Sequence, residues 1–435
     1  MIFKSNLRHN EKNYYDSLFF LLLIIMLVPS FPSKFGNSLI PSTFVLMISL
    51  GVVFTDLERI VVSRKLALFW LFLYVVMLLT ALFSNETISL EDLTELLIPF
   101  STMLFSFWIS TKFKFVNIIS LNLFLNRFLF FSFISSLCLF FVATMEFSLI
   151  YVDWLYELYK PFEKYEDVTR AVTFFSYPYY STFYNLMLLA LIVPLAIHKP
   201  GVISIVCVFL LIAVNLMTQS STGLLSLLIY LIFMFYFSNK KFLNNFFKLT
   251  VLIVPLMFFI IYAEGLLTYL IERHDLYSLR VIRNVVFSPQ DSGTLNTRLE
   301  QIYFSLDATA AKGYLIGGGW GRELFLESFL AYSLYKFGLF FTLFLVFLWI
   351  ERLLSLYKSY KFFKHRNNLM FLLSKSLISF FVVLPLLSSS SFLFFRHKVT
   401  LLFVVILAVS FLLERNRKSI GYGFDEFKCN EHGNN

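Results

Sequence analysis

Residues 128–147 read FLFFSFISSLCLFFVATMEF, and this stretch decides the class of fold. An α-helix needs about 20 predominantly apolar residues to cross the hydrocarbon core of a bilayer. The stretch has that length and that composition, so it is predicted to form a transmembrane helix. Similar apolar stretches continue toward both ends of the chain.

Applied to the whole chain, the same criterion predicts twelve transmembrane helices. We expect them near residues 17–33, 39–55, 66–83, 93–111, 128–147, 180–197, 201–218, 221–237, 247–264, 327–350, 369–388 and 399–413. Only Gln219 and Ser220 separate two of these stretches, which predicts a tight helical hairpin. The predicted fold is an all-α, polytopic integral membrane protein in which residues 1–435 form a single membrane domain.

The composition supports a membrane protein and argues against a nucleic-acid partner. Hydrophobic residues make up 58% of the chain and charged residues 14%, whereas a soluble domain has about 25% charged residues. The net charge of +9 comes mainly from short loops, as expected when the cytoplasmic loops of a membrane protein are basic. Cysteines and histidines are scattered without the spacing of metal ligands, so no metal or other cofactor is expected.

Basic residues also predict the orientation in the membrane. If twelve helices cross, the basic clusters at the N-terminus and after the second, fourth, eighth, tenth and twelfth helices all fall on one side. Positively charged loops stay in the cytoplasm. Both termini are therefore predicted to be cytoplasmic, including a tail over residues 414–435, and the two long loops at 148–179 and 265–326 are predicted to face outward.

The larger outward loop, residues 265–326, is the most informative polar segment. A glycine-rich turn, Gly317–Gly321, lies near its end, and its arginines are Arg273, Arg280, Arg283, Arg298 and Arg322. A guanidinium group binds phosphate oxygens through two parallel hydrogen bonds, and glycine lets the backbone approach a ligand closely. This pattern predicts an anionic ligand at the membrane surface, although a loop arginine can also contact only lipid phosphates.

This loop and the helix after it contain an ordered set of motifs. The run SGTLNTR at residues 292–298 opens an amphipathic stretch, and the glycine-rich turn follows it. The pair Glu327-Ser328 comes next, and then Gly338. From the residues alone, we expect Arg298 to begin a helix at the membrane surface and the glycines to form a close turn before the next transmembrane helix.

Two further segments strengthen the pattern. RAVTFF at residues 170–175 precedes one predicted helix, and TQSSTG at residues 218–223 opens another. In their order and spacing, these motifs resemble the O-antigen polymerase and O-antigen ligase superfamily. The resemblance covers about residues 165–350 and includes the number of predicted helices.

The resemblance implies an enzyme on the outer face of the bacterial cytoplasmic membrane. Members of the superfamily act on polyprenyl-diphosphate-linked glycans, so the expected substrate is an undecaprenyl-diphosphate-linked oligosaccharide. Ligases commonly have His-Asn where this chain has Glu327-Ser328. This departure favours a polymerase of O-antigen or capsule repeat units over a ligase, with membrane lipids, a flippase and a chain-length regulator as further partners.

The resemblance also implies roles for individual residues. Arg298 and Arg170, one from each outward loop, are expected to stabilise the departing diphosphate, because fixed donors aimed at developing negative charge lower the barrier. Glu327 is the expected base for the acceptor hydroxyl, with Glu323 and Asp291 as alternatives. The expected substrate-binding residues are Arg280, Arg283, Gly319, Lys336 and Tyr177.

An alternative from a different class is a flippase or exporter of lipid-linked sugar. Such a protein would spread charged residues through its membrane helices to line a cavity. Here the predicted helices contain few charges and the arginines lie in loops, which favours the enzyme. Lys336 is an exception, because it lies well inside a predicted helix, where a charge is costly and often functional.

Overall fold

The computed structural model describes residues 2–27, 64–83, 99–106, 108–109, 118–147, 171–175, 178–236, 280, 293–311, 315, 317, 326, 328–389 and 397–431. Every regular element in these ranges is an α-helix, which confirms the predicted all-α class for this part of the chain. The main helices are α1 (Ile2–Leu27), α3 (Arg64–Phe83), α5 (Ile118–Phe147), α7 (Pro178–His198), α8 (Val202–Met217), α9 (Ser221–Tyr236), α12 (Gly293–Ala311), α13 (Phe329–Phe363), α14 (Asn368–Ser388) and α15 (His397–Glu431).

Five of the described helices are long and apolar enough to cross a membrane, as a multi-pass membrane protein requires. Their candidate spans are Leu121–Glu146, Pro178–His198, Phe329–Phe363, Asn368–Ser388 and Lys398–Ser419. Shorter apolar helices occur at Tyr15–Leu27, Leu71–Thr80, Val202–Met217 and Ser221–Met234. The total of twelve stays a prediction, because the predicted helices at 39–55 and 247–264 lie outside the described residues and the one at 93–111 is only partly described.

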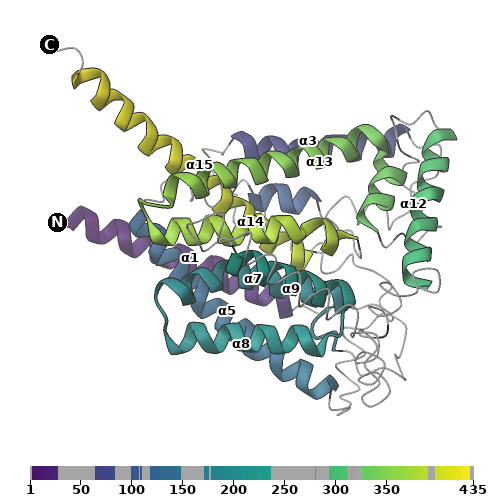
Figure 1. Cartoon of the computed structure of the whole chain (residues 1–435), viewed down its shortest axis with the longest axis horizontal. Helices are drawn as coiled ribbons and strands as arrows, with labels where there is room; N and C mark the ends of the chain where they lie inside the picture. Colours follow the sequence, from purple (N-terminus) through teal and green to yellow (C-terminus); the bar gives the residue numbers. More distant parts are fainter. Residues whose placement is uncertain are drawn as a thin grey trace.

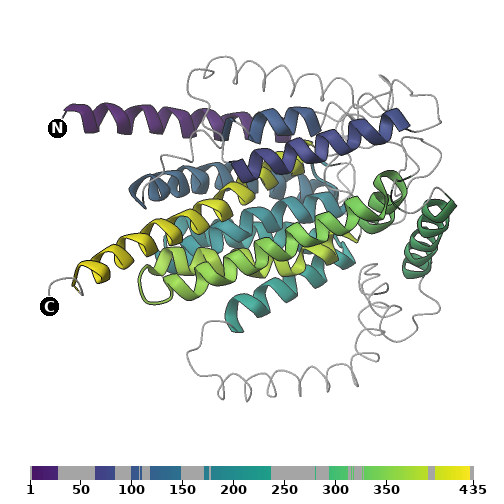
Figure 2. The same cartoon turned by 90° about the horizontal axis from the view of Figure 1, so that it is seen from above.

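Helix α7 forms the centre of the described bundle. It packs against α8 and α14, and every side chain from Tyr180 to Leu195 is buried. A helix that is apolar around its whole circumference needs neighbours on every side, and Figures 1 and 2 show it surrounded by other helices. Ser376 of α14 donates a hydrogen bond to the carbonyl of Ala190 at 2.7 Å and shares another with the Tyr230 hydroxyl of α9 at 2.7 Å, which ties three helices together.

The two ends of the bundle differ (Figure 1). The start of α1, the turn between α13 and α14 and the end of α15 lie at one end, here called the terminal end. Helix α12 lies at the opposite end, crosswise to the other helices, and this end is called the α12 end. The predicted topology also puts both termini and the basic residues 358–366 on one side. That the terminal end faces the cytoplasm stays a prediction.

Helix α15 is longer than the sequence pattern suggested. The last transmembrane helix was predicted to end at residue 413, before a polar tail over 414–435. In the structure the helix continues without interruption to Glu431. Beyond the candidate span Lys398–Ser419, it projects away from the bundle (Figure 1). Most of the predicted tail is therefore a continuation of the last helix.

Candidate functional site at the α12 end

Helix α12 places Arg298 on the side of the helix that faces α13. Arg298, Ile302, Ser305 and Thr309 follow a spacing of three and four residues, which puts them on one face of a helix. Ser305 and Thr309 are buried, and the Thr309 hydroxyl donates to the carbonyl of Leu334 in α13 at 3.1 Å. Arg298 is half-buried, so it lies at the junction of the two helices and is not a fully solvated surface charge.

Helix α13 is broken at Gly338, which has φ 82° and ψ 177°. The break is held by close contact with the chain that precedes the helix. A side chain at Gly338 would place its Cβ 2.5 Å from the carbonyl oxygen of Leu315, and one at Gly317 would collide with the backbone of Lys336 and Phe337. Both positions therefore require glycine. At Gly317 the backbone closely approaches α13; the predicted approach of the glycine-rich turn to a ligand stays a prediction.

Lys336 lies directly before this break and is only 5% exposed. Its ammonium group sits 4.9 Å from the centre of the Tyr332 ring, an arrangement in which the ring face attracts the cation. The break also interrupts the helical hydrogen bonds, so the part of α13 after Gly338 begins with a new helix N-terminus and its partial positive charge. Arg298, Lys336 and this N-terminus make the α12–α13 junction electropositive.

A second polar cluster forms around the segment Ala171–Phe175. One carboxylate oxygen of Glu146, at the end of α5, accepts hydrogen bonds from the backbone N–H groups of Val172 and Thr173, both at 2.8 Å. The N–H of Ala171 donates to the carbonyl of Met217 at 3.0 Å. The segment is buried, so its backbone groups depend on these partners.

The turn between α8 and α9, Thr218–Ser220, belongs to the same cluster. The Thr218 hydroxyl shares a hydrogen bond with that of Thr182 in α7 at 2.9 Å, and a side chain at Gly223 would collide with Thr182. The short connection agrees with the predicted tight hairpin. Residues 171–175 and 218–223, which belong to two motifs far apart in the sequence, are thus brought together around α7.

A large apolar cavity runs along α13. Its volume is about 810 Å³, within the range of about 300–1,000 Å³ that is typical of ligand sites. Ile302, Ser328 and Phe329 line it at the α12 end, whereas Glu351 and Arg352 line it farther along α13. The break at Gly338 lies between these two parts of the lining. Arg298 precedes Ile302 by one turn on the same face of α12, so it lies near the part of the cavity that Ile302 lines.

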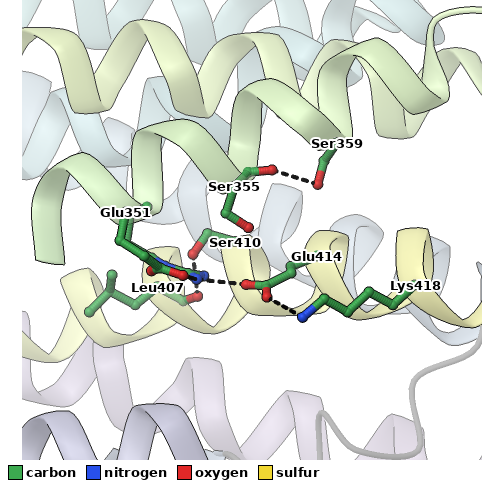
Figure 3. Close-up of polar contacts among 8 residues, drawn as sticks. Glu351, Ser355, Ser359, Leu407, Ser410, Glu414 and Lys418 are labelled. Atoms are coloured by element: carbon green, nitrogen blue, oxygen red, sulfur yellow. Dashed lines mark hydrogen bonds and ion pairs between the residues drawn. The ribbon is translucent and has the colours of Figure 1, made fainter.

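Toward the terminal end, two buried charges, Arg352 and Glu414, pair with each other (Figure 3). The Arg352 guanidinium donates to both carboxylate oxygens of Glu351 at 2.7 and 2.8 Å and to Glu414 of α15 at 2.6 Å. Lys418 reaches the other oxygen of Glu414 at 2.9 Å, and the guanidinium stacks over the Phe411 ring at 3.9 Å. This network connects α13 to α15.

The helices contain more buried charge than the sequence analysis assumed. Lys375 in α14 is 1% exposed, and Glu146, Arg352 and Glu414 are each at most 6% exposed. Lys375 falls within the predicted helix 369–388, so its position in the sequence was a visible signal that was missed. Glu146 likewise falls within the predicted helix 128–147, but its partners follow 26 and 27 residues later, so the sequence did not show what it binds.

Three of the predicted site residues can be placed. Arg298 and Lys336 belong to the packed α12–α13 pair, and Arg280 is exposed. The other five lie outside the described residues, so their predicted roles stay untested: Arg170, Glu327, Arg283, Gly319 and Tyr177. Searches against protein families and curated proteins add no assignment, because no family model matches the chain and no curated protein matches its sequence.

Proposed function

We propose that this protein is a polysaccharide polymerase that joins polyprenyl-diphosphate-linked oligosaccharide repeat units on the outer face of the bacterial cytoplasmic membrane. The observation that carries the proposal is the α12–α13 junction. There, Arg298 and the buried Lys336 lie on packed helices, and Arg298 is one helical turn from Ile302, which lines an apolar cavity. Cationic groups next to an apolar cavity suit a substrate with a diphosphate head and a hydrocarbon chain.

The proposed reaction transfers a glycan from its lipid carrier to an acceptor sugar. The bond between the anomeric carbon and the diphosphate oxygen breaks, and the bond from the acceptor hydroxyl oxygen to that carbon forms. The lipid diphosphate leaves with the bonding electrons, and the hydroxyl proton passes to a carboxylate, for which Glu327 is our candidate. Arg298 and Arg170 would stabilise the negative charge that develops on the leaving diphosphate.

The cavity supports a lipid-linked donor. Its lining is almost entirely apolar, with Leu68 and Phe72 on one side and Phe381, Leu384 and Leu407 on others. An apolar chain that enters such a cavity leaves contact with neighbouring lipids and gains close packing with these side chains. The donor's chain would lie along α13, with its diphosphate at the end where Arg298 and Lys336 lie.

The exporter alternative is favoured by one observation. Lys375 and the paired Arg352 and Glu414 are buried inside apolar helices, and transporters use such buried charges along their substrate pathways. The superfamily ligase remains the second enzyme candidate, and Glu327-Ser328 in place of His-Asn argues for the polymerase.

Deletion of the gene followed by gel analysis of surface polysaccharide separates these functions. A polymerase deletion should abolish the ladder of long chains and retain a single attached repeat unit. Loss of every attached unit would contradict the polymerase and support a ligase or an exporter. Purified protein should then lengthen lipid-linked repeats in detergent, which an exporter cannot do.

A further inference from the structure

The segment Ala171–Phe175 contains a strained backbone conformation. Thr173 has φ 58°, a left-handed conformation that is unfavourable for a β-branched residue. Gln219, in the neighbouring α8–α9 turn, has φ 45°, and the hydrogen bond from Ala171 to Met217 joins the two segments. Strain of this kind persists only where the surroundings enforce it, and it gathers at functional sites.

Four helices enforce the conformation of this segment. The Glu146 carboxylate of α5 accepts hydrogen bonds from the N–H groups of Val172 and Thr173. The carbonyl of Met217, at the end of α8, accepts one from the N–H of Ala171. The Thr173 hydroxyl shares a hydrogen bond with Ser181 of α7 at 3.0 Å. From α15, the Lys398 ammonium donates to the carbonyl of Phe174 at 2.6 Å. Each of the first four residues of the segment is therefore held by a different contact.

Glu146 is the central contact, because one of its oxygens binds two successive N–H groups. Its carboxylate is 6% exposed at the end of the candidate span Leu121–Glu146, where a charged group is costly to bury. Hydrogen bonds from N–H groups to a carboxylate are about twice as strong as those between neutral groups. The burial cost is thus offset by a rigid hold on one short piece of backbone.

That piece of backbone directly follows Arg170 in the sequence. We propose that Glu146 is a positioning residue, which fixes the backbone segment Ala171–Phe175 directly after Arg170 and thereby supports the role that the proposed function gives to that arginine. The inference rests on the proposed polymerase function. One oxygen of Glu146 is bound to backbone N–H groups, so the role proposed for Glu146 is to hold the segment and not to react with the substrate.

Three substitutions of Glu146 test this role in the purified full-length protein with a synthetic lipid-linked repeat. Glu146→Gln keeps a carbonyl oxygen that can accept both N–H groups, so the rate should stay within a few-fold of wild type. Glu146→Ala removes the acceptor and should lower kcat by about 10–100-fold, because a displacement of about 1 Å can cost that much. KM should change little, as expected when stabilisation of the transition state alone is lost. Glu300→Ala, at an exposed glutamate on α12, is the matched control.

A labelling experiment reports the backbone directly, without enzyme activity. Val172 is fully buried. We would place a cysteine there in a chain whose Cys138, Cys207 and Cys429 are replaced by alanine. A water-soluble maleimide should label this cysteine slowly in wild type and in Glu146→Gln, and at least tenfold faster in Glu146→Ala. If Glu146→Ala is absent from membranes, Glu146→Asp, with its shorter side chain, should show faster labelling and a lower kcat in its place.

The outcomes distinguish a failure of the positioning role of Glu146 from a failure of the proposed polymerase function. If wild type joins repeats and Glu146→Ala joins them at the same rate, the positioning role is overturned while the polymerase stands. If Glu146→Ala or Glu146→Asp is inactive but labels as slowly as wild type, the carboxylate acts in the chemistry itself and the positioning role is again overturned. If wild type does not join lipid-linked repeats at all, the proposed function fails.

Discussion

The two ends of the helix bundle use buried charge in different ways. Toward the terminal end, Arg352, Glu414 and Lys418 pair with one another across two regular helices. At the α12 end, Glu146 and Lys398 bind backbone groups of an irregular segment instead, and α13 itself is broken at Gly338. Charges that pair with charges connect helices, whereas charges that bind backbone hold a particular loop conformation.

This difference indicates where the chemistry lies. All three described residues with positive φ, Thr173, Gln219 and Gly338, belong to segments at the α12 end. Strained backbone lowers stability, and it is retained where function requires the geometry. We therefore expect substitutions toward the terminal end to reduce stability without changing the chemistry, and substitutions at the α12 end to reduce activity. The predictions below test this division.

The largest effect should come from breaking the charge network. Arg352→Leu removes the buried guanidinium that pairs with Glu414 and leaves the half-exposed Lys418 beside it. Removing one member of a buried pair typically costs about 3–5 kcal/mol of folding free energy. Unfolding in mixed detergents should show this loss. The surviving protein should keep most of its polymerisation rate per folded molecule, because Arg352 lines only the part of the cavity away from the α12 end.

Two controls accompany Arg352→Leu. The double variant Arg352→Leu/Glu414→Leu should recover most of the lost stability, because neither charge is then left unpaired. Arg366→Leu, at an exposed arginine in the turn after α13, should have a small effect. The division between the two ends is wrong if Arg352→Leu is stable but inactive.

The next largest effect concerns Arg298. If it stabilises the leaving diphosphate, Arg298→Ala should lower the rate by about 10²–10³-fold and collapse the long-chain ladder, with normal protein level in membranes. Arg298→Lys should recover little, because a point charge cannot replace a two-pronged contact. Gel analysis of surface polysaccharide measures both. Arg322→Ala, in the same predicted loop, should be the milder control, and a normal ladder from Arg298→Ala would leave this residue a simple surface charge.

A smaller effect is expected at the break in α13. Gly338→Ala forces an L-residue into a positive-φ, extended conformation that essentially only glycine adopts, at a cost of about 1–3 kcal/mol, and the added Cβ also meets the carbonyl of Leu315. Thermal unfolding should begin earlier, and chain length should fall because the Lys336 segment shifts. Gly201→Ala is the control, since a Cβ there has only Ser204 within reach, at 3.8 Å. If Gly338→Ala and Gly201→Ala unfold at the same temperature and give the same chain length, the break in α13 does not depend on glycine at position 338.

The sequence predicted the helices better than the site. Apolar runs identify α5, α7, α8 and α9 within a few residues, except that α5 begins earlier, because burial in lipid depends mainly on local composition. The break at Gly338 depends on contact with Gly317, 21 positions earlier in the chain, and no local pattern reports such a contact. The role of Glu146 depends in the same way on a distant backbone segment. By contrast, the charge of Lys375 was readable and was missed.

The last prediction is that removal of metal ions has no effect on the rate of elongation. Neither long loop contains a His-x-x-x-His, Cys-x-x-Cys or EF-hand pattern. In the proposed reaction, arginines stabilise the leaving diphosphate, so excess chelator should not slow elongation of lipid-linked repeats by purified protein. A metal-dependent glycosyltransferase assayed in the same buffer should stop, which confirms that the chelator is effective. If elongation stops as well and returns on addition of Mg²⁺ or Mn²⁺, the leaving group is held by a metal ion. The function assigned to Arg298, and with it the chemical role of the α12 end, would then have to be abandoned.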